Sequence, residues 1–142
     1  MSATGPAAGP PRMVGPASPE SAPFWEATRE RRLVLQWCRE CDRPVQYPRA
    51  VCPRCMGSAL EWREASGAGR IYAATVEHRP ETMGASEPYA VVLVDLAEGA
   101  RLMGNLAGDP AAARVGASVR VTWEPLEDGR HLPLFELDKE AG

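Results

Sequence analysis

The sequence has no hydrophobic run long enough to cross a membrane and no segment that resembles a secretory signal. No apolar stretch approaches the roughly 20 residues that a membrane-spanning helix needs. The N-terminus lacks the basic start and the apolar stretch of a signal peptide, so we expect no export and a cytoplasmic location. In such a reducing compartment, paired cysteines bind metal more often than they form disulfides.

Motifs for catalysis are also missing. The only two histidines are His78, at the end of an expected strand, and His131, after an expected turn, and we expect both at the surface. The sequence has no G-x-S-x-G, no H-E-x-x-H and no phosphate-binding loop. We therefore expect that the chain is not an enzyme on its own.

The charge is polarised along the chain, although the net charge is only -3. Three acids accompany seven arginines between positions 29 and 54 (29, 31, 32, 39, 43, 49 and 54), whereas acids outnumber bases from Glu81 onward. Nucleic-acid binding needs a basic groove with exposed aromatic side chains. The C-terminal half is acidic, and at least two of its four aromatic residues should be needed for a core, so we expect no nucleic-acid partner.

The chain begins with a segment rich in glycine, proline and alanine, and we expect a disordered tail over residues 1–20. A short helix is expected over 21–32, with Ser21 as its cap and Pro23 in its first turn. The stretch 33–37 alternates Leu33, Leu35 and Trp37 with Val34 and Gln36, which predicts a strand.

The C-terminal half predicts a small barrel. Turn signals separate five short strands, at residues 70–79, 89–96, 101–106, 118–125 and 132–137. A hairpin is expected over 97–99, a turn over 127–131 and a short helical stretch near 110–114. These elements fit a five-stranded barrel of the OB type over residues 66–138.

All four cysteines form two C-x-x-C pairs with ten residues between them. This spacing lets each tight turn aim two sulfurs at one ion, and Pro53 favours the second turn. We expect one structural Zn²⁺ in a zinc ribbon over 33–65, because four thiolates leave no open coordination position. Rubredoxin-type iron and two redox disulfides are the alternatives. The expected ligands are Cys38, Cys41, Cys52 and Cys55.

Several segments together resemble the acyl-CoA-associated OB-fold proteins, in which a rubredoxin-like zinc ribbon precedes an OB barrel. The resemblance covers about residues 21–137 and implies a mainly β fold with a short N-terminal helix. It implies a non-catalytic scaffold subunit of a thiolase or aldolase that acts on acyl-CoA in lipid, polyketide or steroid side-chain metabolism. A MaoC-type hydratase is a further partner that it implies, and it assigns zinc to the four cysteines. The segments are FWEATRERRLVLQWC, the C-x-x-C and C-P-x-C pairs, YPR, LEW and SGAGRIYAATV.

Six other residues are candidates for binding the partner or CoA. An apolar anchor beside arginines suits a partner surface or the phosphates of CoA. The aromatic candidates could instead pack the helix against the ribbon, and Trp37 and Trp62 are expected to do so. A standalone acyl-CoA or nucleic-acid binding module is the alternative function, followed by an iron electron carrier. The candidates are Phe24, Trp25, Arg43, Tyr47, Arg49 and Arg54.

Overall fold

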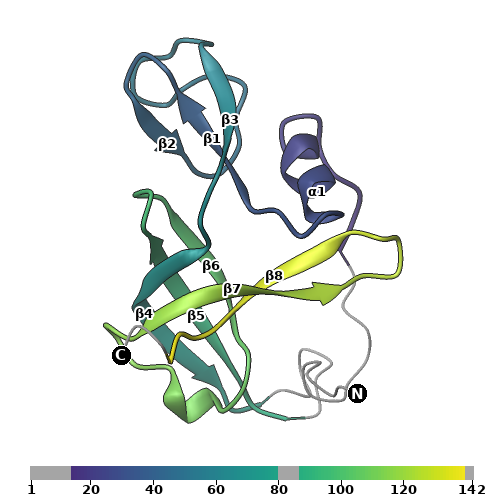
Figure 1. Ribbon diagram of the computed structural model, residues 1–142, viewed down its shortest axis with the longest axis vertical. Helices are drawn as coiled ribbons and strands as arrows, with labels where there is room; N and C mark the ends of the chain where they lie inside the picture. Colours follow the sequence, from purple (N-terminus) through teal and green to yellow (C-terminus); the bar gives the residue numbers. More distant parts are fainter. Residues whose placement is uncertain (1–13, 80–86, 140–142) are drawn as a thin grey trace.

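A computed structural model of the chain describes residues 14–79 and 87–139, and residues 1–13 of the expected tail lie outside this range. The described residues form a short helix, a three-stranded sheet and a five-stranded barrel (Figure 1). In chain order, the elements are α1 (Ala22–Thr28), β1 (Val34–Cys38), β2 (Arg43–Val45), β3 (Leu60–Glu64), β4 (Ala68–Glu77), β5 (Tyr89–Leu96), β6 (Arg101–Leu106), the 3-10 turn η2 (Pro110–Ala112), β7 (Ser118–Pro125) and β8 (His131–Leu137).

The barrel is closed in the strand order β4-β5-β6-β8-β7, with β7 returning to β4. All pairings are antiparallel except that of β6 with β8, which meet in parallel at Leu106 and Phe135. This is the topology of an OB fold, and it confirms the predicted five-stranded barrel. The hairpin expected over 97–99 joins β5 to β6, and η2 lies within the stretch expected to be helical.

The barrel core follows the alternation of β5. Its residues Ala90, Val92, Val94 and Leu96 point inward and are buried, whereas the residues between them are only half-buried. Phe135 from β8 and Ile71 from β4 complete the fully buried centre. Gly69 allows β4 and β5 to approach closely, because a Cβ at this position would lie 2.6 Å from the carbonyl oxygen of Asp95.

The remaining sheet, which we call the cysteine ribbon (residues 34–64), has the order β2-β1-β3. Its central strand β1 does not show the alternation that the sequence suggested, since Val34, Leu35 and Gln36 are all buried. One face of β1 packs on the barrel core through Leu35, and the other lies under the cysteine loop (residues 46–59) through Gln36. Both faces are therefore covered.

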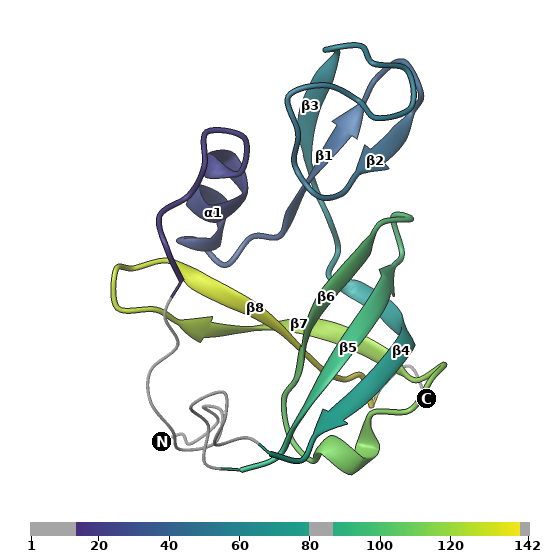
Figure 2. The same cartoon turned by 180° about the vertical axis from the view of Figure 1, so that it is seen from behind.

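The cysteine ribbon sits above one end of the barrel, and two hydrogen bonds tie it there (Figure 2). The hydroxyl of Tyr47 accepts a hydrogen bond from the amide of Met103 in β6 at 3.1 Å. The carboxylate of Glu98 in the β5–β6 hairpin accepts one from the amide of Ser66 at 2.8 Å. The first bond holds the cysteine loop against β6, and the second holds the segment that joins the ribbon to the barrel.

Helix α1 ends at Thr28, earlier than the predicted range 21–32, because Arg31 takes a left-handed conformation with a φ of 56°. Two contacts with His131 fix this end to the start of β8: its amide donates to the hydroxyl of Thr28, and its Nδ1 lies 2.8 Å from the carbonyl oxygen. Before α1, the carbonyls of Val14 and Gly15 accept hydrogen bonds from the buried Arg130. This part of the expected tail is held against the β7–β8 hairpin.

Candidate metal centre and its loop

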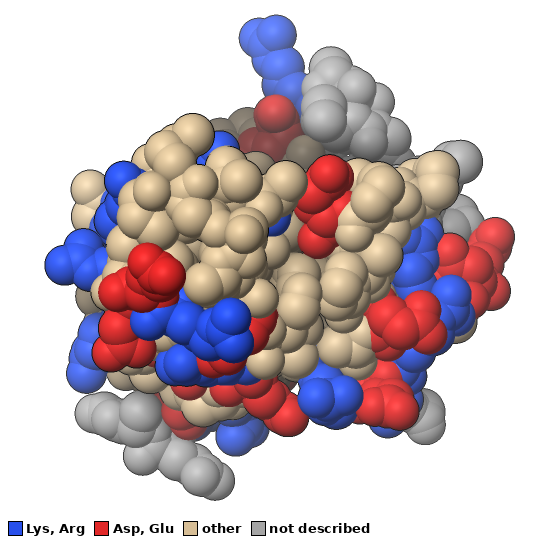
Figure 3. Space-filling model, turned by 90° about the horizontal axis from the view of Figure 1, so that it is seen from above, with Lys and Arg blue, Asp and Glu red and all other residues tan. Residues whose placement is uncertain are grey.

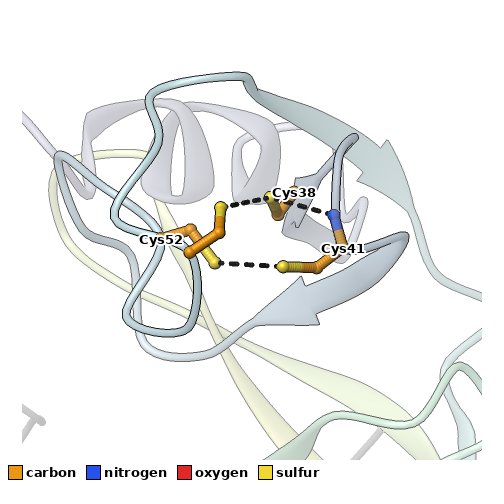
Figure 4. Close-up of side chains that lie close together, drawn as sticks. Cys38, Cys41 and Cys52 are labelled. Carbon is orange, nitrogen blue, oxygen red and sulfur yellow. Dashed lines mark hydrogen bonds between the residues drawn. The ribbon is translucent and has the colours of Figure 1, made fainter.

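The four cysteines converge on one point in the cysteine ribbon (Figure 4). All four Sγ atoms lie within 4.8 Å of one another, with 3.7 Å from Cys38 to Cys55 and 3.9 Å from Cys41 to Cys52. Tetrahedral zinc with Zn–S bonds of about 2.3 Å places its sulfurs about 3.8 Å apart. A disulfide would bring two sulfurs to about 2.05 Å. The donors and their spacing therefore suit one tetrahedral metal ion and not a pair of disulfides.

Backbone amides approach three of the sulfurs. The amides of Cys41, Arg54 and Gly57 donate to the sulfurs of Cys38, Cys52 and Cys55, each at 3.4 Å. Such hydrogen bonds spread the negative charge of bound thiolates. The residue after each C-x-x-C pair, Asp42 or Met56, has a positive φ that reverses the chain. The two turns therefore share one geometry.

The thiols differ in how readily they lose their protons. Amide hydrogen bonds, led by that of Cys55, lower the pKa of Cys52 to about 6. Burial and then contact with the neighbouring thiols raise the pKa of Cys41 to about 12. Four thiolates this close repel one another, and a cation between them offsets that repulsion.

The ligand set is closed. Among the described residues, these four cysteines form the only cluster of three or more metal-binding side chains. His78 is exposed, and His131 is engaged with Thr28 at the end of α1. An ion held by four sulfurs has no position for a substrate, so the centre can shape the loop but cannot activate a ligand.

The cysteine loop carries three of the predicted binding residues, and the structure holds its backbone firmly. The side-chain amide of Gln36 donates to the carbonyl of Arg49 and accepts from its amide, at 2.9 and 2.8 Å. The side chains of Arg49 and Arg54 are exposed, and Tyr47 is 50% exposed although its hydroxyl is bonded. Arg43 is exposed on the neighbouring strand β2.

Phe24 and Trp25 lie apart from this loop, on α1. Their rings meet edge to face with centroids 5.1 Å apart, and Phe24 packs against the barrel core. The guanidinium of Arg130 lies 5.3 Å from the centroid of the Trp25 ring. Both aromatic residues are half-buried in contacts with the barrel, so the structure does not join them with the loop in one site.

The arginines near the ribbon do not form a continuous basic surface. Arg32 pairs with Glu30 and Glu64, each at 3.2 Å, and Arg29 pairs with Glu26. Arg63 pairs with Glu61 and stacks on the Trp37 ring. Figure 3 looks down on this end of the molecule, where acidic and basic side chains lie next to each other. This face thus differs from the basic groove that nucleic-acid binding needs.

Two residues that matter here were missed by sequence reasoning. Gln36 is a polar residue in an apolar strand, and that irregularity could have singled it out. Arg130 follows a turn signal and looks like an ordinary surface arginine, yet it is 7% exposed and bonds to Asp128 and two carbonyls. Only the fold reveals its role.

Comparison with protein families matches the two parts of the chain in turn. Residues 25–61 match the family described as "ChsH2, rubredoxin-like zinc ribbon domain", and residues 62–124 match "ChsH2, C-terminal OB-fold domain". No helix among the described residues is both long enough and apolar enough to span a membrane.

Curated relatives include two proteins named as hydratase subunits and a scaffold protein. A probable enoyl-CoA hydratase alpha subunit of Thermomonospora curvata is 37% identical over 84% of this chain and 38% of its own length. The 3-oxo-4,17-pregnadiene-20-carboxyl-CoA hydratase alpha subunit of Mycobacterium tuberculosis is 30% identical over 84% and 39%. The chain thus spans about two-fifths of these two relatives. A DUF35 domain-containing scaffold protein of Methanocaldococcus jannaschii is 31% identical over 74% of this chain and 78% of its own.

A chain in one solved structure has the same architecture as this protein. The chain matches one from the structure titled "Ltp2-ChsH2(DUF35) aldolase" with a TM-score of 0.79 and 34% identity, over 87% of this chain and 98% of the other. These matches confirm the family resemblance that the sequence motifs indicated. The chain therefore belongs to the ChsH2/DUF35 family, whose members combine a rubredoxin-like zinc ribbon with a C-terminal OB-fold domain.

Proposed function

We propose that the chain is a zinc-binding scaffold subunit, without catalysis of its own, that assembles with a thiolase-fold enzyme. Its partner is a thiolase or an aldolase that acts on an acyl-CoA, and steroid side-chain breakdown is the favoured pathway. The observation that carries this proposal is the similarity to the DUF35 chain of an aldolase structure, over 98% of that chain. The name of the Mycobacterium tuberculosis relative, a pregnadiene-carboxyl-CoA hydratase subunit, favours a steroid substrate for the assembly.

The geometry of the cysteine cluster supports a scaffold role. Four sulfurs complete a tetrahedral shell, so the ion offers no position to a substrate. Zinc is the ion that we propose, because it is redox-inert and suits a tetrathiolate site whose role is structural. Iron in the same site would colour the protein red, so an absorption spectrum with elemental analysis separates the two metals.

A hydratase is a second candidate partner, because two relatives are named as hydratase alpha subunits. We propose that a MaoC-type hydratase belongs to the same assembly as the thiolase-fold enzyme. The chain spans about two-fifths of those relatives, and the whole relatives carry the hydratase names.

Exposed arginines beside the metal centre suit the phosphates of CoA. Arg49 and Arg54 project from a loop that the metal and Gln36 hold in place, and Arg43 lies on the adjoining strand. A guanidinium binds phosphate oxygens through two parallel hydrogen bonds. We propose these three side chains, with Tyr47, as the part of the scaffold that contacts the partner or its CoA.

Co-expression tests the assembly directly. The chain is produced together with the thiolase-fold protein encoded by a neighbouring gene, and the mixture is separated by size exclusion. Co-elution in one peak is expected, and elution of each protein alone would reject the scaffold function. Titration of the chain with single-stranded DNA at low and high salt tests the nucleic-acid alternative, which salt-sensitive binding would revive.

Replacement of Arg49 tests whether the cysteine loop contacts the partner or its CoA. We expect Arg49→Ala to weaken partner or CoA affinity while the zinc content stays the same, because the Gln36 contacts use only the Arg49 backbone. Arg114→Ala, an exposed arginine after η2, is the matched control. Unchanged affinity for Arg49→Ala would remove this residue from the binding surface.

A further inference from the structure

We propose that the outer face of β4, β5 and β6, extended by Tyr47, is the surface that docks on the thiolase-fold partner. This inference rests on the proposed scaffold function and names the part of the chain that performs it. We call this surface the Tyr47–Met103 face, and it consists of Tyr47, Tyr72, Leu93, Arg101 and Met103.

Large apolar side chains are exposed on this face to an unusual degree. Met103 is 59% exposed, Tyr72 is 51% exposed and Tyr47 is 50% exposed. Met103 lies directly opposite Leu93 in the β5–β6 pairing, and the Tyr47 hydroxyl bonds to its amide. Interface centres are rich in tyrosine, methionine and arginine, and this is the composition of the face.

An irregularity in β4 places Tyr72 on the face. The pairing of β4 with β5 shifts between Ile71, which is opposite Val94, and Ala73, which is opposite Leu93. Tyr72 is the extra residue of this bulge, so its ring projects outward while Ile71 stays in the core. Bulges bend a strand, which helps a barrel to close, and they commonly re-aim one side chain in this way.

The charged and polar groups of the face are already paired. Arg101 donates two hydrogen bonds to Asp95, at 2.6 and 3.2 Å, and its guanidinium lies 3.4 Å from the centroid of the Tyr72 ring. The Met103 amide is satisfied by Tyr47. A partner can therefore cover the face without leaving a buried charge unpaired. An unpaired buried charge is the usual reason why burying ionic groups is unfavourable.

This pairing also indicates the chemistry of the occupant. A surface whose charges are neutralised internally complements a neutral, apolar protein surface and not a polyanion. The face is continuous with the cysteine loop, because Tyr47 belongs to that loop and bonds to the Met103 amide. The binding partner that we propose for this face is therefore a thiolase-fold chain with an apolar patch. The alternative partner is a second copy of this chain.

A charge placed in the centre of the face provides the test. The full chain and the thiolase-fold protein from the neighbouring gene are purified, and their affinity is measured by calorimetric titration. Met103→Glu and Tyr72→Ala are compared with Val115→Glu, which introduces the same charge at an apolar residue that is 71% exposed in the turn between η2 and β7. Circular dichroism and zinc content show whether each variant is folded.

We expect Met103→Glu and Tyr72→Ala to weaken binding at least about tenfold, as for residues at an interface centre, and Val115→Glu to change it less than about threefold. Wild-type affinity in a folded Met103→Glu variant would show that the Tyr47–Met103 face is not the docking surface, while leaving the scaffold function intact. No binding by the wild-type chain would overturn both proposals. A wild-type dimer that Met103→Glu dissociates would assign the face to self-association and overturn the partner proposal.

Discussion

The buried side chain of Gln36 hydrogen-bonds to Arg49 at both its amide and its carbonyl, at 2.8 and 2.9 Å. This bidentate contact joins the central strand of the cysteine ribbon to the middle of the loop between the two cysteine pairs. The metal centre fixes the loop near its cysteines, and Gln36 fixes the segment that no cysteine reaches. The backbone between the two cysteine pairs is therefore held at both ends by the metal centre and in the middle by Gln36, and it presents its exposed side chains from this fixed position.

Replacement of Gln36 tests this contact. Gln36→Leu leaves the Arg49 amide and carbonyl without their partner, which should lower the free energy of unfolding by about 1–3 kcal/mol. Chemical denaturation and the rate of zinc transfer to a coloured chelator measure the effect. Gln36→Glu keeps the acceptor for the Arg49 amide but sets a buried carboxylate against the Arg49 carbonyl, so it should cost at least as much. An unfolding midpoint and transfer rate equal to wild type in Gln36→Leu would show that the contact is dispensable.

Removal of the metal should unfold the cysteine ribbon first. The barrel has its own buried core, whereas the ribbon has a much smaller one around Cys38, Val45 and Cys52. Binding energy of about 10 kcal/mol or more would act as folding energy for such a module. We expect a chelator to accelerate amide hydrogen exchange over 33–62 before it affects the barrel. Less than half an equivalent of zinc in the purified chain would contradict this account.

Gly69 should tolerate no side chain. A Cβ there would lie 2.6 Å from the carbonyl oxygen of Asp95, and this backbone atom cannot move without opening the β4–β5 pairing. Gly69→Ala should therefore destabilise the barrel by about 1–3 kcal/mol, as overpacked cores do. Gly15→Ala is the control, because its Cβ would meet nothing within 4 Å. Equal melting temperatures for the two variants would refute the close approach.

The contact between Asp128 and Arg130 should make stability depend on pH. Hydrogen bonds from the Arg130 side chain and backbone lower the pKa of Asp128 in the folded chain. A carboxyl with a lowered folded pKa stabilises the fold above its unfolded pKa of about 3.9, and this stabilisation is lost as the pH falls through the folded value. Asp128→Asn should thus be less stable than wild type at pH 7, with the difference shrinking below about pH 4.

Denaturation midpoints across this pH range measure that difference. Glu127→Gln, in the same turn, is the matched control and should follow the wild-type curve. A constant gap between Asp128→Asn and wild type down to pH 2 would rule out an ionic origin for the contact.

The sequence predicted the barrel well because its signals are local. The bounds expected for β5, β6 and β7 match those observed, since glycine and acidic turn residues separate strands that alternate or are continuously apolar. The spacing of the cysteines likewise predicted their convergence. Both features depend on residues that are close together in the chain.

The contacts between distant segments could not be predicted in this way. Tyr47 and Met103 are 56 positions apart, and nothing near either residue signals their hydrogen bond. The strand expected over 33–37 is present as β1, but the burial of both its faces could not be predicted, because the periodicity of a strand does not show that a loop will cover its second face. Arg130 was missed for the same reason, since its burial depends on the packing of α1 and residues 14–15 against the β7–β8 hairpin.

Exchange of the metal tests most directly the claim that the cysteine cluster is a structural clasp and not a reaction centre. Cadmium accepts the same four thiolates in the same tetrahedral geometry but is a different Lewis acid. The chain loaded with zinc or with cadmium is assembled with the thiolase-fold partner that we propose, and the activity of the two complexes is compared. The account predicts equal activity within about twofold, because the metal only shapes the loop. A cadmium complex that assembles fully but loses most of its activity would contradict it.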